Sequence, residues 1–149
     1  MEDKRFFYHP GVDPIALFRS LYLNFKYSKK LSGASTLTMQ VIRLSGNRRK
    51  RTYFEKIREL LLSLRMEVGF SKKEILQLYA DHAPFGGNVV GISAAGWRYF
   101  GRETDELSWA ETALLAVLPN SPSLIHPGKN RPLLKQKRDR LLKKLLSYH

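Results

Sequence analysis

The chain has 149 residues, of which 43% are hydrophobic, and this is enough for one globular domain with a substantial core. Its formal net charge of +13 favours a polyanionic partner or substrate: nucleic acid, an anionic membrane surface or a phosphate-bearing molecule. The absence of cysteine excludes disulfides and thiolate metal sites, and the four histidines lack the spacing of zinc ligands.

Two acids and an aromatic run open the chain, Glu2-Asp3 and then Phe6-Phe7-Tyr8. Composition alone favours a frayed, solvated N-terminus here. The pair Asp13-Pro14 then predicts a helix start, because Asp is a good N-cap and Pro suits the first helical position. A helical face of apolar residues follows, and two leucines add apolar surface on its other side: Ile15, Phe18, Leu21, Tyr22 and Phe25, with Leu17 and Leu23. Such a helix either packs in a core or binds a membrane surface, and the sequence leaves both open.

The stretch Ser32–Gln40 combines a glycine, four hydroxyl side chains and an amide, with basic residues before and after it. A loop of this kind that leads into a helix can present N–H groups and hydroxyls to a phosphate. The alternative is structural: Ser35 N-caps a short helix over about Thr38–Leu44. The run Arg48–Arg51 that follows is typical of a solvated basic turn.

Three capping boxes mark further helix starts, at Thr52, Ser71 and Ser108, each with Glu three residues later. They predict helices that end near Phe70, near Tyr79 and at Leu118. The first of these carries the apolar stripe Phe54, Ile57, Leu61 and Leu64. Two more helices are expected over about 90–100 and 132–147, and the breakers in 84–88 predict a turn. No strand-like alternation appears, so the predicted class is all-α with about seven helices.

Five blocks then match, in order, the motifs of a known family. They are Glu2-Asp3 with Phe6, His9 and Gly11; Gly33–Gln40 with Arg43; Lys56-Ile57-Arg58-Glu59; Ile75-Leu76 and Tyr79 to Gly101; and Leu107 to Pro127. With these blocks the chain resembles the peptidoglycan glycosyltransferases, the murein polymerase domain of class A penicillin-binding proteins and of monofunctional transglycosylases. Met39 and Glu55 stand where that family commonly has Gln and Arg, and Asp81 where it has Asn.

The resemblance implies a lysozyme-like all-α fold over residues 1–149, with a smaller membrane-facing (jaw) subdomain at about residues 12–52. It implies polymerisation of lipid II with release of polyprenyl pyrophosphate. The family assigns the general base to Glu2 and a second carboxylate to Glu59. The resemblance places Arg43 and Lys56 on the pyrophosphate side, and Ser35, Thr36 and Gln40 as substrate contacts. Asp3 would orient the site or bind a divalent metal, Mg2+ or Mn2+; no other metal ligand is assigned.

The expected partners are lipid II, the growing glycan strand, an anionic membrane surface, moenomycin-type inhibitors and a fused transpeptidase domain, but not nucleic acid. The expected location is the outer face of the bacterial cytoplasmic membrane. No apolar run reaches the roughly 18–20 residues of a membrane span, so we expect any membrane anchor to lie outside these residues. Two alternatives to the polymerase remain: a lysozyme-like hydrolase or lytic transglycosylase, and a polymerase fold with weakened activity that binds lipid or a partner.

Overall fold

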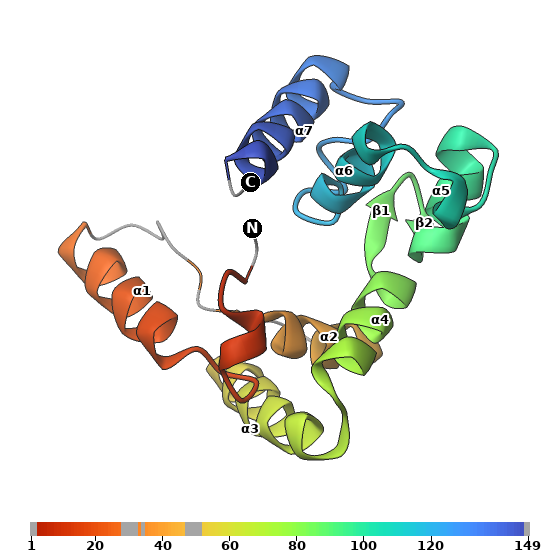
Figure 1. Cartoon of the computed structure of the whole chain (residues 1–149). Coiled ribbons are helices and arrows are strands. Elements are labelled where there is room, and N and C mark those ends of the chain that lie inside the picture. The colour runs from red at the N-terminus through yellow and green to blue at the C-terminus, as the bar shows by residue number, and fades with distance from the viewer. Residues whose placement is uncertain (1–2, 28–32, 34, 47–51, 148–149) are drawn as a thin grey trace. The chain divides into compact units, whose positions relative to one another are not determined.

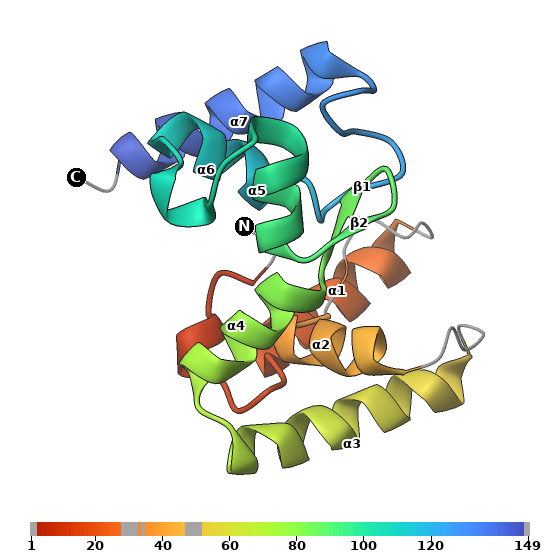
Figure 2. The same cartoon turned by 90° about the vertical axis from the view of Figure 1, so that its right-hand side faces the viewer.

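A computed structural model describes residues 3–27, 33, 35–46 and 52–147 of the chain. The described residues form two compact units, Met1–Tyr79 and Ala80–His149, hereafter unit 1 and unit 2 (Figures 1 and 2). Within these residues there are seven α-helices, and the strands form only one small hairpin. The predicted all-α class is therefore confirmed. The expected jaw, at about residues 12–52, falls within the sequence span of unit 1.

Unit 1 contains the short 3-10 helix η1 (Phe6–Tyr8) and three complete helices, α1 (Pro14–Lys26), α2 (Leu37–Ser45) and α3 (Tyr53–Gly69). The first part of α4 (Lys72–His82) also belongs to it. Its core gathers side chains from η1 and from the last three helices: Phe6, Val41 and Ile75 are buried, and Leu37, Met66, Leu78 and Tyr79 pack against them. The aromatic run at the N-terminus is divided, because Phe6 is buried whereas Phe7 and Tyr8 are exposed.

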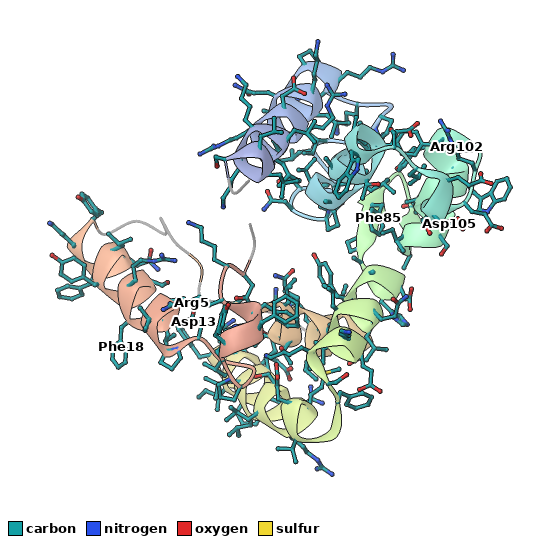
Figure 3. The ribbon with its side chains drawn as sticks, viewed as in Figure 1. Arg5, Asp13, Phe18, Phe85, Arg102 and Asp105 are labelled. Carbon is teal, nitrogen blue, oxygen red and sulfur yellow. The ribbon has the colours of Figure 1, made fainter. Side chains whose placement is uncertain are left out.

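Helix α1 begins as the sequence predicted, at Pro14 after the N-cap Asp13. The Asp13 carboxylate accepts from the Ala16 N–H at 3.0 Å and from Arg5 at 2.7 and 3.1 Å, and Figure 3 shows the Arg5 and Asp13 side chains directed toward each other. Burial raises the pKa of Asp13, but the hydrogen bonds from Ala16 and Arg5 outweigh it, so the pKa is lowered overall. The Arg5–Asp13 ion pair therefore joins the N-cap of α1 to the N-terminal segment.

The apolar faces of α1 and α3 point outward. On α1 the exposed residues are Ile15, Phe18, Tyr22 and Phe25. Core packing, one of the two alternatives for this helix, is therefore wrong for these residues. The Leu21 side chain lies outside the described part. The stripe predicted on α3 is exposed as well. On the inward side of α3, Ser63 is fully buried and Met66 packs against the core. The backbone of α3 at Ser63 also lies close to Gly11 on this side.

Unit 2 continues from α4 into the hairpin β1 (Pro84–Gly86) and β2 (Val89–Val90), then α5 (Ile92–Phe100), η2 (Thr104–Glu106), α6 (Trp109–Val117) and α7 (Arg131–Leu146). The hairpin corrects the predicted turn: its strands are too short for alternation to be visible in the sequence. The Tyr99 hydroxyl donates to the carbonyls of Phe85 and Gly86, at 3.1 and 2.9 Å, and joins α5 to the hairpin. Leu115, Leu118 and Ile125 lie in the core of this unit.

The predicted helix boundaries hold closely in unit 2. The capping box at Ser108 and Glu111 is present in both directions, and Gly101 ends α5 in the left-handed conformation with φ of 69°. Arg102, shown in Figure 3, donates to the same Glu111 at 2.8 Å. Glu111, which lies in the fifth family block, therefore has a structural task at the start of α6. Helix α4 extends three residues beyond the predicted Tyr79, to His82.

A substitution at Gly11 tests the close approach between the N-terminal segment and α3. Its φ is +79°, and a Cβ there would lie 2.6 Å from the Ser63 carbonyl oxygen. We expect Gly11→Ala to lower the free energy of unfolding by about 1–3 kcal/mol from the backbone conformation alone, and more from the clash. Urea unfolding measures this. Gly69→Ala is the control, because nothing lies within 4 Å of its Cβ position. Equal midpoints for Gly11→Ala and wild type would contradict the expectation.

Candidate active site

Asp3 is the first of the predicted site residues that the structure describes, and it is buried. Its side chain is 3% exposed, and its two oxygens lie 3.1 and 3.0 Å from Nε2 of His9. The backbone N–H of Leu37 donates to one of these oxygens at 3.0 Å. The N-terminus at Asp3–His9 is therefore not frayed, which corrects the expectation from composition: a carboxylate at the start of α2 satisfies a helix donor and is favoured by the helix dipole.

A second, partly buried network also binds this segment. The ammonium of Lys72 donates to the His9 carbonyl at 2.6 Å and to Oε1 of Glu67 at 2.7 Å, and it lies 4.6 Å from the centroid of the Phe6 ring. The Thr38 hydroxyl donates to the same Glu67 oxygen at 2.6 Å. Glu67 and Lys72 were not predicted as site residues because each stands alone in the sequence without a motif, and only the fold brings them together.

Thr36, and not Ser35, is the N-cap of α2, which corrects the structural alternative for this loop. The Thr36 hydroxyl oxygen accepts from the Met39 N–H at 3.2 Å, and the hydroxyl donates to the Gly11 carbonyl at 2.5 Å. With Leu37 bonded to Asp3, these two N–H groups at the start of α2 already have partners within the protein. A phosphate at this loop would therefore be bound chiefly by side chains and not by the N–H groups of Leu37 and Met39.

Ser35 belongs instead to a charged cluster that joins the loop, α2 and α3. Nζ of Lys56 lies 2.7 Å from the Ser35 hydroxyl and 3.6 Å from Oε2 of Glu59. Arg43 donates to both oxygens of Glu59, with Nε and one terminal nitrogen each at 2.8 Å. This is a bidentate guanidinium–carboxylate pair, a strong form of charged hydrogen bond. The structure thus brings four predicted site residues, Ser35, Arg43, Lys56 and Glu59, into one cluster.

The electrostatics of this cluster favour its charged form. Burial raises the pKa of Glu59, but the hydrogen bonds and charge of Arg43, with Lys56, outweigh it and lower the pKa overall. The hydrogen bond to Glu59 likewise raises the pKa of Arg43. Glu59 is therefore ionised at neutral pH. It can orient cations or accept a proton, but it holds no proton to donate.

Two of the three residues that depart from the family motifs, Met39 and Glu55, have structural explanations. Met39, where the family commonly has Gln, is 2% exposed and lies in the core. Glu55, where the family commonly has Arg, donates its N–H to the Thr52 hydroxyl and begins α3, as predicted. Arg58 lies 3.4 Å from the Glu55 carboxylate. Gln40 is half-buried on α2.

Several predicted residues lie outside the described part of the chain. These are Glu2, the expected general base, the basic run Arg48–Arg51, and Ser32 and Ala34 of the central loop. Asp3 was the one expected metal ligand. Within the described residues, no group of three His, Asp or Glu side chains could hold a metal ion, and both Asp3 oxygens already accept hydrogen bonds. The described residues by themselves therefore do not form a divalent-metal site.

The Arg43–Glu59 pair gives a pH-dependent prediction. Because the pKa of Glu59 is lowered by folding, its stabilising effect is present above the unfolded carboxyl pKa of roughly 4.3 and is lost as pH falls through the lower, folded pKa. We expect Glu59→Gln to lower the free energy of unfolding by about 1–2 kcal/mol at pH 7, allowing for screening of the partly exposed guanidinium. This difference between the two proteins should become smaller at acidic pH. Urea unfolding of both proteins across this range measures the difference, and a constant difference would contradict the assignment.

The comparisons with known proteins agree with these motifs. The Transglycosylase family model matches residues 1–146. Penicillin-binding protein 1C of Escherichia coli is 42% identical over 97% of this chain and 19% of its own length, and penicillin-binding protein 1A of Aquifex aeolicus is 37% identical over 97% and 20%. A Cupriavidus necator protein described as a transglycosylase is 41% identical over 98% of this chain and 63% of its own. The chain thus spans about a fifth of the length of the penicillin-binding proteins that it matches. It belongs to the transglycosylase family.

Proposed function

We propose that this chain is a peptidoglycan glycosyltransferase domain that polymerises lipid II into glycan strands. In this reaction the 4-hydroxyl of an incoming disaccharide attacks C1 of the growing chain, with inversion, and polyprenyl pyrophosphate leaves. The observation that carries the proposal is the cluster of Ser35, Arg43, Lys56 and Glu59. It combines two cations with a hydroxyl and a carboxylate that orients both cations. Family membership supports the same reaction.

The reaction needs a carboxylate that takes the proton of the attacking hydroxyl. We assign this role to Glu2. Its neighbour Asp3 is fixed by His9 and by the Leu37 N–H at the start of α2. A general base must lie within hydrogen-bonding reach of the proton that it abstracts.

The departing pyrophosphate needs positive charge. We assign Arg43 and Lys56 to it; their side chains are 37% and 43% exposed and so remain accessible to an anionic ligand. Ionised Glu59 orients both cations and is the second carboxylate of the site. Ser35 and Gln40 are the proposed hydroxyl and amide contacts. The Thr36 hydroxyl is buried and bonded on both sides, which supports a structural role in place of the expected substrate contact.

A hydrolase or lytic transglycosylase would cut glycan with one acid and would need no cationic pocket for a diphosphate. The bidentate Arg43–Glu59 pair and the contact of Lys56 with Ser35 favour the polymerase. Incubation with lipid II separates these functions, because only a polymerase releases polyprenyl pyrophosphate and makes long strands. A chain with no turnover that still binds lipid II would support the third alternative, a weakened polymerase fold acting as a lipid-binding platform.

The base assignment gives a direct test. We expect Glu2→Gln to abolish polymerisation nearly completely, because the amide cannot take the proton, while lipid II binding persists. Strand formation from labelled lipid II, separated by gel, measures the effect. The matched control is Glu74→Gln, since Glu74 is an exposed carboxylate on α4 that bonds only to Ser71 among the contacts described. Retained polymerisation by Glu2→Gln would remove Glu2 from this role.

A divalent metal, Mg2+ or Mn2+, remains part of the proposal through the family resemblance and the charge of the pyrophosphate. When bound, such a metal would supply further positive charge to the leaving group. Asp3 is the described residue that the resemblance proposes as a metal ligand, but its oxygens already form hydrogen bonds with His9 and the Leu37 N–H. The same polymerisation assay with a chelator, and with either metal restored, tests the requirement.

We also propose that the domain works at the outer face of the bacterial cytoplasmic membrane, on anionic lipid. No described helix is long and apolar enough to cross a membrane. Contact would come from α1, where Phe18 and Tyr22 are 72% and 62% exposed and Figure 3 shows Phe18 projecting away from the helix. The proposed partners are the glycan strand, moenomycin-type inhibitors that compete for the cationic cluster, and a fused transpeptidase domain; nucleic acid is not among them.

Liposome flotation tests the contact through α1. We expect Phe18→Glu with Tyr22→Glu to reduce binding to anionic vesicles about tenfold or more, since two exposed aromatic side chains leave the interface and two negative charges enter it. Leu146→Glu is the control, because Leu146 is also exposed but lies in unit 2. If the double variant floats as well as wild type, α1 does not contact the membrane.

A further inference from the structure

Lys72, on α4, differs from the lysine of the charged cluster because its ammonium is turned into unit 1. Its side chain is 21% exposed, against 43% for Lys56, and the Glu67 side chain that it bonds to is 8% exposed. An ammonium has three N–H donors, and the structure gives this one two acceptors and an aromatic ring: the His9 carbonyl, Glu67 and the face of Phe6. Its donors are therefore directed at the protein and not at an anionic ligand.

The Lys72–Glu67 pair joins α4 to the two helices that carry the charged cluster. Glu67 lies on α3, and Thr38, whose hydroxyl donates to the same Glu67 oxygen, lies on α2. An ion pair this far buried adds little net stability, because the cost of removing two charges from water offsets much of their attraction. What the pair does supply is a fixed position for the ammonium relative to α2 and α3.

The His9 carbonyl is the point at which Lys72 acts on the N-terminal segment. It accepts from Lys72 at 2.6 Å and from the Gly11 N–H at 3.0 Å. The His9 ring is buried as well, with Nε2 bonded to Asp3, whereas its Nδ1 has no hydrogen-bond partner among the described residues. Because hydrogen bonds hold the ring at one nitrogen only, its position depends on the backbone that Lys72 fixes.

Asp3 passes this position on to α2. Its carboxylate bonds to the His9 ring on one side and accepts from the Leu37 N–H at 3.0 Å on the other. A series of contacts thus runs from Lys72, through the carbonyl and ring of His9, to Asp3 and the first turn of the helix that carries Arg43. In an active site, a displacement of about 1 Å caused by such a distant support can reduce the rate about a hundredfold.

We propose that Lys72 is a positioning residue for the glycosyl transfer. Its ammonium fixes the His9 carbonyl and thereby orients the His9 ring and the Asp3 carboxylate against the start of α2. Lys72 acts through these residues and is not itself assigned a contact with substrate. The effect on rate rests on the proposed function, whereas the effect on the N-terminal segment is measurable without turnover.

The alternative is that the pair only stabilises unit 1, and the choice of variants separates the two roles. Lys72→Met alone would leave the buried Glu67 carboxylate without its cation, which destabilises the fold by itself. The comparison is therefore between Glu67→Gln and the double variant Glu67→Gln with Lys72→Met. Both proteins lack the carboxylate, and they differ only in the ammonium at the His9 carbonyl, since Met keeps an unbranched apolar stem.

The kinetics of lipid II polymerisation compare these variants. We expect the double variant to have a kcat about tenfold or more below that of Glu67→Gln, with a KM within about twofold, because misplacement removes transition-state stabilisation and not ground-state binding. Lys73→Met is the matched control, since Lys73 is the next residue of α4 and is exposed; it should keep the wild-type kcat. Urea unfolding of each protein gives its folded fraction. An equal kcat for Glu67→Gln and the double variant, or a loss that the unfolded fraction accounts for, would overturn the proposal.

Hydrogen exchange followed by NMR tests the positioning without turnover. We expect Lys72→Met, in the Glu67→Gln background, to speed exchange of the Gly11 and Leu37 N–H groups about tenfold or more, since Lys72 holds their acceptors in place. The Lys56 N–H, hydrogen-bonded at the opposite end of α3 from Glu67, is the control. Unchanged exchange at Gly11 and Leu37, or an equal rise at Lys56, would overturn the inference. A wild-type chain that makes no strands, together with the expected exchange, would refute the proposed function and leave Lys72 as the residue that fixes this segment.

Discussion

The buried carboxylate of Asp3 is the constraint on which unit 1 depends. It joins the N-terminal segment, through His9, to the first N–H of α2, and it satisfies a helix donor that the core would otherwise leave unpaired. Thr36 repeats this connection from α2 to Gly11. Because of these bonds, the N–H groups of Leu37 and Met39 already have partners and are not left to bind a phosphate. In the proposed site the nearby basic side chains bind it instead.

The charge distribution follows from the same arrangement. The described carboxylates of the N-terminal segment, of the α1 N-cap and of α3 form caps and ion pairs, where they fix the backbone or orient cations. Basic and apolar side chains are left at the surface. Because bonded carboxylates are not displayed outward, the positive charge seen in the composition becomes a field directed at anions. A diphosphate substrate and an anionic lipid surface both suit that field.

Helix α3 has two chemically different sides. Its inner side carries Lys56 and Glu59, and its outer side carries Phe54, Ile57, Leu61 and Leu64, which are exposed. The fold could not exchange these sides, since the Ser63 backbone lies close to Gly11, Glu67 bonds to Lys72 and Glu59 bonds to Arg43. The same contacts therefore hold the charged cluster inward and leave the apolar residues outward.

The sequence by itself determined the helices and the family, because capping boxes, Asp13-Pro14 and Gly101 act over a few residues and ordered motifs need no coordinates. It also identified Ser35, Arg43, Lys56 and Glu59. Only the tertiary structure decided that Thr36 caps α2, that Asp3 is buried, and that Glu67 and Lys72 support His9. It also turned the apolar faces of α1 and α3 outward. The physical reason is that periodicity identifies an apolar face but not what covers it, whereas partners distant in sequence depend on the whole packing.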